Sequence, residues 1–289
     1  MVQILNDRGH GVNTWPPSKG TNASGGVPAM AEHDFNAAVG DETERLLKGK
    51  LSVYSAQGSR QADVPLNTRI ARYNQQFHSD KKAIGMSHHG NANGNKQTRG
   101  FGVFYWHTSA AGKRLAQMIL AEYKREFPDM PIWGSGIFAS KIGDWTNFAM
   151  LRDTAAPFVL IEWEFFTNDA ARKIMLTSDY RKRCGKVASK VACDWHGVKF
   201  EEEKLAAVVK PATPEPVVKP EAPKPVPVSK PALSPAWKVE FDKQFAEAKE
   251  LGITDGTRRK DPVSREEAAV MSVRAVQAAV DQVITVLKK

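Results

Sequence analysis

Apolar residues follow two patterns in the first two hundred positions of the chain: short continuous runs, and positions that recur every three or four residues. Short apolar runs favour strands, and they cover residues 2–5, 51–56, 82–87, 102–105 and 158–162. Between these runs, apolar positions recur every three or four residues, which predicts helices over residues 31–48, 65–77, 112–127, 168–175 and 180–196. Strands that alternate with helices are typical of an α/β domain built on a mostly parallel sheet.

A change of composition ends this domain. Nine prolines occur in the twenty-five residues from Pro211 to Pro235. Because proline lacks the backbone donor that helices and sheets need, residues 205–236 should form a semi-rigid, extended linker. The linker would join a domain of residues 1–200 to a small all-helical module of residues 237–289.

The net charge of the chain indicates an anionic partner but does not identify its class. The net charge is +9, which suits nucleic acid, an anionic cell wall or a membrane surface. We find no interleaving of aromatic and basic residues, no zinc-finger spacing and no helix-turn-helix punctuation, so we expect no nucleic-acid partner.

Neither disulfides nor membrane insertion is expected. Cys184 and Cys193 fall on one predicted helix, about 13 Å apart at ~1.5 Å per residue, which is too far for a disulfide. No apolar stretch is long enough to span a membrane. The N-terminus lacks the basic and apolar regions of a signal peptide, so we expect synthesis and retention in the cytoplasm unless another factor releases the protein.

Two candidate metal ligands lie in the N-terminal part. His10 follows the first predicted strand between Gly9 and Gly11, where glycines allow a sharp turn and close backbone approach. Glu32 falls in the first turn of the first helix, a position where an acid often only complements the helix dipole. His33 is next to Glu32 and competes as a ligand, but neighbouring helical side chains point about 100° apart.

A second group of candidates follows later strands. His88 and His89 come after the strand at 82–87, and neighbouring extended residues point to opposite faces, so only one of them should face a site. Glu162 ends the apolar run at 158–162, where a carboxylate is costly unless it is paired or functional. Glu164 could share its face. Two histidines and one carboxylate suit a catalytic zinc ion, and a further carboxylate could act as a general base.

Four short motifs occur in a fixed order around these residues. They are the segment from Asp7 to Gly11, Glu32 at the start of a helix, the Ser87, His89, Asn91 and Ala92 set, and the Val159, Leu160, Ile161, Glu162, Phe165, Thr167 and Asn168 set. In this order the chain, over roughly residues 1–195, resembles the type 3 family of zinc N-acetylmuramoyl-L-alanine amidases. Glu164 stands where that family usually has glycine.

The resemblance implies a fold, a cofactor and a reaction. The fold would be α/β, with a twisted, mostly parallel sheet of about six strands flanked by helices. One Zn²⁺ would be held by His10, Glu32 and His89, which selects His89 over His88, and Glu162 would be the catalytic base. The reaction would be hydrolysis of the amide between N-acetylmuramic acid and L-alanine in peptidoglycan. The alternatives are a zinc peptidase or deacylase on the same scaffold and a non-catalytic wall-binding or structural protein.

The C-terminal part carries a second resemblance. The segments ELGITDGT and DPVSREEAAVM are similar to part of a surface-layer homology repeat, which implies binding of a secondary wall polymer through residues 237–289. A dimerising helical hairpin is the alternative, although we expect a monomer. The whole arrangement resembles a bacteriophage endolysin, made in the host cytoplasm and acting on the cell wall after release; a bacterial autolysin with the same activity is the other candidate.

Overall fold

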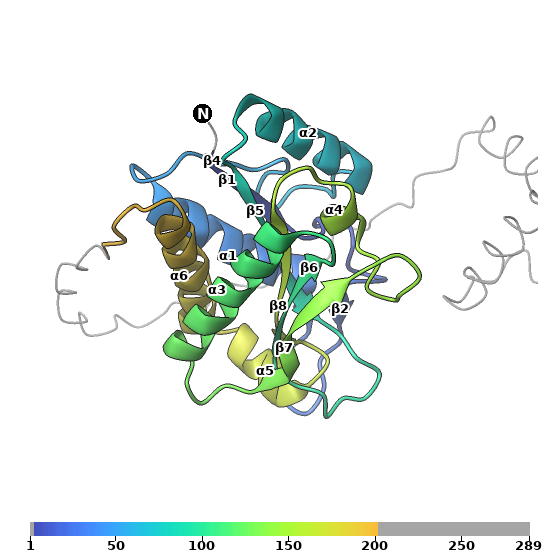
Figure 1. Cartoon of the computed structure of the whole chain (residues 1–289). Coiled ribbons are helices and arrows are strands. Elements are labelled where there is room, and N and C mark those ends of the chain that lie inside the picture. The colour runs from blue at the N-terminus through green and yellow to red at the C-terminus, as the bar shows by residue number, and fades with distance from the viewer. Residues whose placement is uncertain (1–2, 202–289) are drawn as a thin grey trace, which may run out of the picture. The chain divides into compact units, whose positions relative to one another are not determined.

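The computed structural model describes residues 3–201, which are coloured in Figure 1. The expected linker (205–236) and the expected helical module (237–289) lie outside the described residues.

A twisted sheet of six strands forms the centre of the described part. The strand order is β4-β1-β5-β8-β6-β7. The strands are β1 (Ile4–Arg8), β4 (Val53–Tyr54), β5 (Ile84–Asn91), β6 (Phe101–Trp106), β7 (Ile132–Ser140) and β8 (Phe158–Phe165). Strands β4, β1, β5 and β8 run parallel, whereas β6 is antiparallel to β8 and β7 is parallel to β6. The predicted α/β class, with a mostly parallel sheet of about six strands, is confirmed.

Helices cover both faces of this sheet (Figure 1). The long helices α1 (Glu32–Leu47), α3 (Ala110–Glu126) and α6 (Ser178–Trp195) pack together on one face. Helices α2 (Leu66–Ser79) and α4 (Ala149–Arg152) lie on the other face, and α5 (Asp169–Met175) follows β8. A small antiparallel pair, β2 (Gly20–Thr21) and β3 (Met30–Ala31), leads directly into α1.

Strand β8 begins with four consecutive apolar residues, Phe158 to Ile161, and its position in the sheet explains this run. Val159, Ile161 and Trp163 join the cluster under α1, α3 and α6, while Phe158 and Leu160 join the cluster on the α2 and α4 face. Both faces of a central strand are buried, so both sets of alternating positions must be apolar. The same alternation directs the side chain of Glu162 toward the α2 and α4 face.

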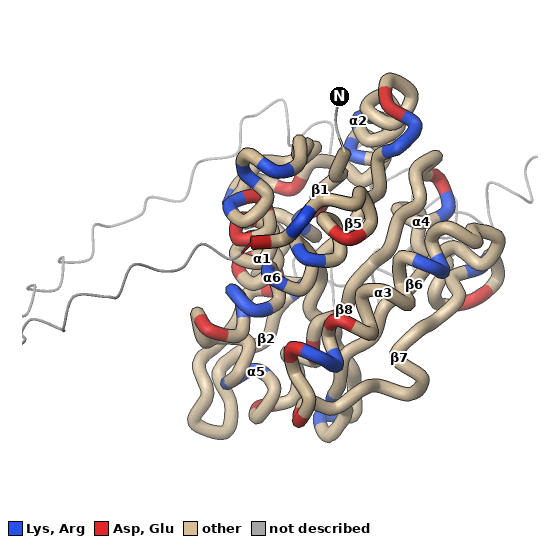
Figure 2. Tube along the Cα trace, turned by 60° about the vertical axis from the view of Figure 1, so that its left-hand side comes forward, with Lys and Arg blue, Asp and Glu red and all other residues tan. Residues whose placement is uncertain are grey.

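Two further sequence expectations can be compared with the structure. Cys184 and Cys193 are free and buried, as expected. No helix among residues 3–201 is long and apolar enough to cross a membrane. Basic and acidic positions lie interspersed over the elements in Figure 2, with no face of a single sign in that view.

The structure departs from the sequence prediction at a few elements. Strand β5 continues to Asn91 instead of ending at residue 87, so both His88 and His89 lie on the strand. Strand β7 was absent from the predicted set because Gly134 and Gly136, both with positive φ, interrupt its apolar pattern. The four-residue helix α4 is too short for periodicity to reveal.

Candidate active site

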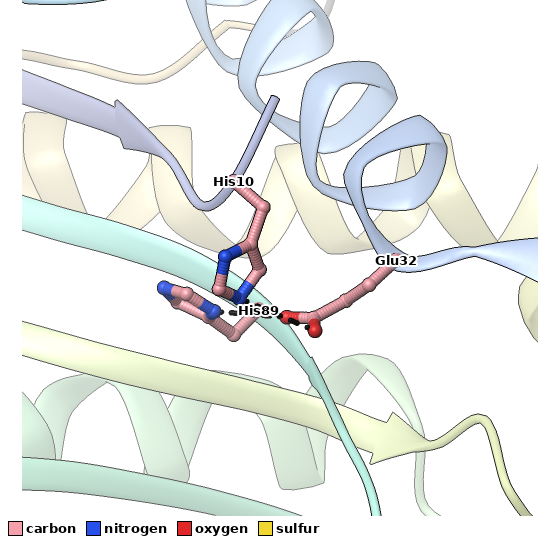
Figure 3. A group of neighbouring side chains, drawn as sticks. All are labelled: His10, Glu32 and His89. Atoms are coloured by element: carbon pink, nitrogen blue, oxygen red, sulfur yellow. Dashed lines mark hydrogen bonds and ion pairs between the residues drawn. The ribbon is translucent and has the colours of Figure 1, made fainter. Parts of the chain in front are cut away.

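Three polar side chains meet where β1 and β5 end. His10 lies two residues after β1, Glu32 is the first residue of α1, and His89 lies near the end of β5. Each offers one ligand atom, and these atoms all lie within 4.8 Å of one another. Figure 3 shows both imidazoles pointing at the Glu32 carboxylate, with His10 Nε2 3.3 Å from Oε2 and His89 Nδ1 2.9 Å from Oε1.

The electrostatics of these three residues suit a metal ion. Burial would raise the pKa of Glu32, but His10 and His89 outweigh burial and hold that pKa well below its usual range. Burial lowers the pKa of His10, which favours the neutral imidazole, the form that binds metals. Both imidazoles retain some exposure, 17% for His10 and 14% for His89. Two nitrogens and one carboxylate oxygen with access from solvent are a donor set of catalytic zinc sites.

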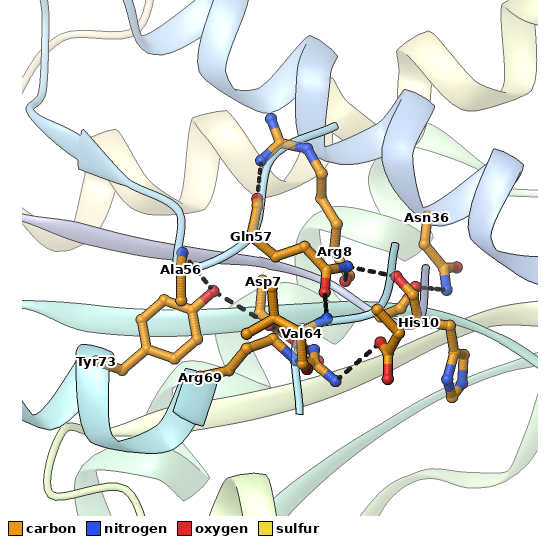
Figure 4. A network of polar contacts seen from close by, with 12 residues as sticks. Asp7, Arg8, His10, Asn36, Ala56, Gln57, Val64, Arg69 and Tyr73 are labelled. Atoms are coloured by element: carbon orange, nitrogen blue, oxygen red, sulfur yellow. Dashed lines mark hydrogen bonds and ion pairs between the residues drawn. The ribbon is translucent and has the colours of Figure 1, made fainter. Parts of the chain in front are cut away.

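The backbone of His10 is held in an uncommon conformation. Its φ is 63°, in the left-handed region that non-glycine residues seldom adopt. The Asn36 side-chain amide donates to the carbonyl of Gly9 at 2.9 Å, and that of Gln57 donates to the carbonyl of His10 at 2.5 Å. Figure 4 shows these two amides on either side of the His10 backbone. The two hydrogen bonds fix the direction in which the imidazole leaves the chain.

Gly9 explains the glycine that precedes His10. A Cβ atom built at Gly9 would lie 2.3 Å from Cε1 of His89, far inside van der Waals contact. Only a residue without a side chain therefore allows the β1 end to approach the His89 ring.

The structure places His89, and neither His88 nor His33, in the cluster. His88 points to the opposite face of β5, where its Nε2 lies 3.0 Å from Asn6 Oδ1 and its Nδ1 accepts a hydrogen bond from Trp163. Burial lowers the pKa of His88 to about 3, so this ring is a neutral interior group. His33 is also buried, and its ring nitrogens have no hydrogen-bond partner among residues 3–201.

Glu162 lies beside the cluster without belonging to it. It is the register partner of His89 across the parallel pair of β5 and β8, so the two side chains share a face. Its Oε2 is buried and lacks a hydrogen-bond partner within the described chain. Burial and the neighbouring Glu32 charge raise the pKa of Glu162 well above its usual value, while Lys19 opposes this shift. The result is a carboxyl group suited to holding and releasing a proton.

Glu164 has a different surrounding. One oxygen accepts hydrogen bonds from the backbone N–H groups of Gly100, at 2.5 Å, and Phe165, at 3.0 Å. The other oxygen forms an ion pair with Arg99 at 3.2 Å. Glu164 therefore fastens the segment that precedes β6 to the end of β8, and both its oxygens are engaged.

A buried polar network behind the ligands was not predicted from the sequence. The Asp7 carboxylate accepts hydrogen bonds from the Arg69 guanidinium at 2.8 and 3.1 Å, from the Ser87 hydroxyl at 2.6 Å and from the Tyr73 hydroxyl at 3.1 Å. Figure 4 shows Asp7, Arg69 and Tyr73 of this network beside β1. Asp7 and Ser87 could have been found as the polar residues of their motifs that are not ligands. Nothing in the pattern around Arg69 or Gln57 indicates their contacts.

Comparison with known proteins adds to this geometry. In structure, the chain is similar to the catalytic domain of CwlV, an N-acetylmuramoyl-L-alanine amidase from Bacillus (Paenibacillus) polymyxa var. colistinus, with a TM-score of 0.56 and 21% identity over 69% of this chain and 100% of that one. It is also similar to an N-acetylmuramoyl-L-alanine amidase from Clostridium difficile 630, with a TM-score of 0.56 and 19% identity over 68% of this chain and 98% of that one. For Ami1 from Mycobacterium smegmatis the TM-score is 0.54, at 17% identity over 68% and 97% of the two chains.

The structural similarities establish the fold, and sequence comparison establishes the family. No curated protein sequence matches the chain at a significant level. The sequence profile described as N-acetylmuramoyl-L-alanine amidase matches residues 4–192, a range that holds His10, Glu32, His89 and Glu162. The chain belongs to the N-acetylmuramoyl-L-alanine amidase family of enzymes.

Proposed function

We propose that this amidase is a zinc enzyme that cleaves the bond between N-acetylmuramic acid and L-alanine in peptidoglycan, with Glu162 as its base. The observation that carries the proposal is the convergence of His10, Glu32 and His89 within 4.8 Å, beside the Glu162 carboxyl group, whose buried Oε2 has no hydrogen-bond partner among residues 3–201. A carboxylate outside the ligand set and next to it is what metal-assisted hydrolysis requires.

The chain's own residues account for the proton transfers. A zinc ion held by the three ligands would supply Lewis acidity, which polarises a substrate carbonyl and makes water more acidic. Glu162 accepts the proton of the attacking water and then delivers it to the nitrogen of the leaving L-alanine. Its raised pKa helps the second step, because a carboxyl group that holds its proton more firmly persists as an acid until the amine departs.

Replacing Glu162 by glutamine tests the base. Glutamine has nearly the same shape but cannot take up a proton, so the rate of release of new L-alanine amino termini from purified walls should fall by roughly 10²–10⁴-fold. Zinc content should stay unchanged, because Glu162 is not one of the three clustered ligands. Full activity of Glu162→Gln would assign the base to another group, and cleavage at other bonds by the unmodified chain would favour a peptidase or deacylase.

The two neighbouring histidines provide a matched test of the ligands. We expect His89→Ala to lose bound zinc, whereas His88→Gln should retain zinc and lose only stability, since His88 is held inside the domain by Asn6 and Trp163. Metal analysis after dialysis measures both. Retention of zinc by His89→Ala together with its loss from His88→Gln would reverse the assignment.

The biological role follows as a second part of the proposal. We propose that the chain is a bacteriophage endolysin that lyses the host, acting as a monomer with residues 237–289 binding a secondary wall polymer. The proline-rich sequence between the two parts supports this modular arrangement. When the chain is produced inside bacteria, lysis should begin only after the cytoplasmic membrane is permeabilised. Lysis without permeabilisation would instead indicate an exported autolysin.

A further inference from the structure

Two large apolar side chains are exposed on the segment between β7 and α4. The exposed fraction is 71% for Ile142 and 68% for Trp145. A single exposed apolar residue is ordinary, but a contiguous patch marks a binding surface. Trp145 is part of such a patch, because its ring packs on three other aromatic rings, those of Phe104, Trp133 and Phe148, instead of standing alone.

This aromatic surface begins beside the proposed base. Gly102 on β6 is the register partner of Glu162 on the antiparallel strand β8, so their side-chain positions are about 5 Å apart. A Cβ atom at Gly102 would lie 3.1 Å from both the Trp133 and the Phe138 rings. The two rings therefore cover the position directly next to Glu162, on the same face of the sheet.

From there the surface extends to Trp145. The ring centroids of Trp133 and Trp145 are 6.1 Å apart, and those of Trp133 and Phe138 are 4.7 Å apart. Trp145 also contacts the buried ring of Phe104 edge-on, at 5.9 Å. These contacts hold the indole in place while most of its surface stays in solvent, so an incoming group meets a preorganised platform.

The chemistry of the surface selects one side of the substrate. The scissile amide joins a sugar to a peptide; the peptide carries free carboxylates, whereas the amidated sugar strand is uncharged. The Trp133, Phe138 and Trp145 rings carry no charge. Away from β6 and β7 lies the exposed Lys19, whose carbonyl accepts the N–H of Glu32 at the start of α1, a helix that packs on β1 and β5. A cation there suits an anionic peptide, which leaves the aromatic side for the sugar.

We propose that Trp133 and Trp145 form a subsite for the glycan strand, with uncharged N-acetyl amino sugars stacked on the indole rings. Sugar rings present C–H groups on one face, and the partially negative face of an aromatic ring attracts them. Trp133 would contact the sugar that carries the scissile amide, and Trp145 the next sugar along the strand. This inference rests on the proposed function, since it names the part of that substrate which the surface binds.

Binding of peptide-free glycan strands tests the subsite without relying on catalysis. The strands are titrated calorimetrically into the full zinc-loaded chain and its variants. Trp145→Ala should weaken binding roughly tenfold, whereas Trp145→Phe, which keeps a ring face, should weaken it by roughly threefold or less. Leu66→Ala is the matched control, because Leu66 is also exposed, at 38%, but lies on α2. Equal affinity of Trp145→Ala and the unmodified chain would overturn the subsite.

Kinetics separate this inference from the proposed function. Trp145→Ala should raise the KM for long glycan strands with stem peptides roughly tenfold and leave kcat, and the rate on a single-sugar muramoyl peptide, nearly unchanged. If the unmodified chain releases L-alanine termini but the KM of Trp145→Ala is unaltered, the subsite is wrong and the function stands. If the unmodified chain releases none, the function fails. Altered self-association of Trp145→Ala in sedimentation, with unchanged glycan affinity, would show a contact between copies and also overturn the subsite.

Discussion

Gln57 supports the candidate metal ligand His10 through hydrogen bonds to the backbone. Its side-chain amide donates to the carbonyls of Arg8 and His10, and its oxygen accepts the N–H of Val64. In Gln57→Ala the His10 turn loses this support, and we expect zinc affinity to fall by roughly 10–100-fold, as for other partners that orient metal ligands. Competition with a chelator of known affinity measures the change.

The control for this variant is the same glutamine-to-alanine change at a position away from the site. Gln75 is exposed on α2, so Gln75→Ala should bind zinc like the unmodified chain. Unchanged zinc affinity of Gln57→Ala would mean that the left-handed turn at His10 is maintained without the amide.

Asp7 gives the domain a pH-dependent contribution to stability. Burial alone would raise the pKa of Asp7, but Arg69 and Ser87 outweigh burial and hold this pKa below its usual value. The folded state therefore favours the ionised form. Its contribution is fully present above the unfolded pKa of about 3.9 and is lost as the pH falls through the lower folded pKa.

Asp7→Asn should remove this contribution and leave the Arg69 charge buried without its partner. We expect the free energy of unfolding at neutral pH to fall by about 3–5 kcal/mol. The unfolding free energy should also depend less on pH below about pH 4 than in the unmodified chain. Denaturant titrations at several pH values measure both effects, with Asp129→Asn, at an exposed position, as the control. If the unfolding free energy of Asp7→Asn depends on pH below about pH 4 as strongly as that of the unmodified chain, other carboxyl groups dominate this dependence.

At the scale of single residues, sequence motifs supply candidates and backbone geometry selects among them. The pair His88 and His89 could not be resolved by spacing, because the alternation of a strand fixes only that the two point apart. Register decides the matter, since His89 stands opposite Glu162 and His88 opposite the core residue Ile161. The roles of Gln57 and Arg69 depend on contacts with residues far away along the chain, which no local pattern encodes.

The segment before β6 is fastened to β8 by Glu164. Glu164→Ala removes the acceptor for the N–H groups of Gly100 and Phe165 and the partner of Arg99. A buried donor left unpaired costs about 1–3 kcal/mol, so we expect a loss of that size in unfolding free energy and faster hydrogen exchange at Gly100.

Glu164→Gln separates the two functions of this side chain. Glutamine keeps an oxygen for the backbone donors but loses the charge that pairs with Arg99, so its loss of stability should be smaller than that of Glu164→Ala. Equal exchange rates at Gly100 in all three proteins would show that the segment is held by other contacts.

The length and burial of a helix or strand determine how clearly its sequence predicts it. Helices α3 and α6 pack one apolar stripe against the sheet, and their sequences show that period over more than four turns. Strand β7 lies at the edge of the sheet with several exposed residues, so its apolar alternation is weak. The end of β5 carries polar residues of the site, so the apolar pattern that predicts a strand stops before the strand itself ends.

Across the described domain, the sheet brings the site together from distant parts of the sequence. Strands β1, β5 and β8 are parallel neighbours, so their carboxyl ends meet, and they carry or lead to His10, His89 and Glu162. The order of these strands could be expected only from the family resemblance. Hydrophobic periodicity indicates neither which strands pair nor that β6 is antiparallel to β8.

The described part should fold and catalyse without the residues that follow it. Val198 and Phe200, beyond the end of α6, still pack against the main core, so a chain ending at residue 201 keeps the whole apolar cluster, whereas one ending at residue 195 loses these contacts. We expect residues 1–201 to unfold cooperatively, to bind zinc and to cleave a soluble muramoyl peptide at the rate of the full chain. Residues 1–195 should be less stable by about 1–3 kcal/mol, in line with loss of partly buried apolar side chains.

Intact walls should distinguish residues 1–201 from the full chain, because a second binding part raises the effective concentration of the enzyme on its polymer. If residues 237–289 bind the wall, their removal should slow the clearing of wall suspensions by roughly 10²-fold at low enzyme concentration, with less effect at high concentration, where occupancy no longer limits the rate. Turbidity at a series of enzyme concentrations measures this. Equal clearing by both proteins at every concentration would mean that the C-terminal residues serve another purpose, while failure on the soluble substrate alone would show that the catalytic domain extends beyond residue 201.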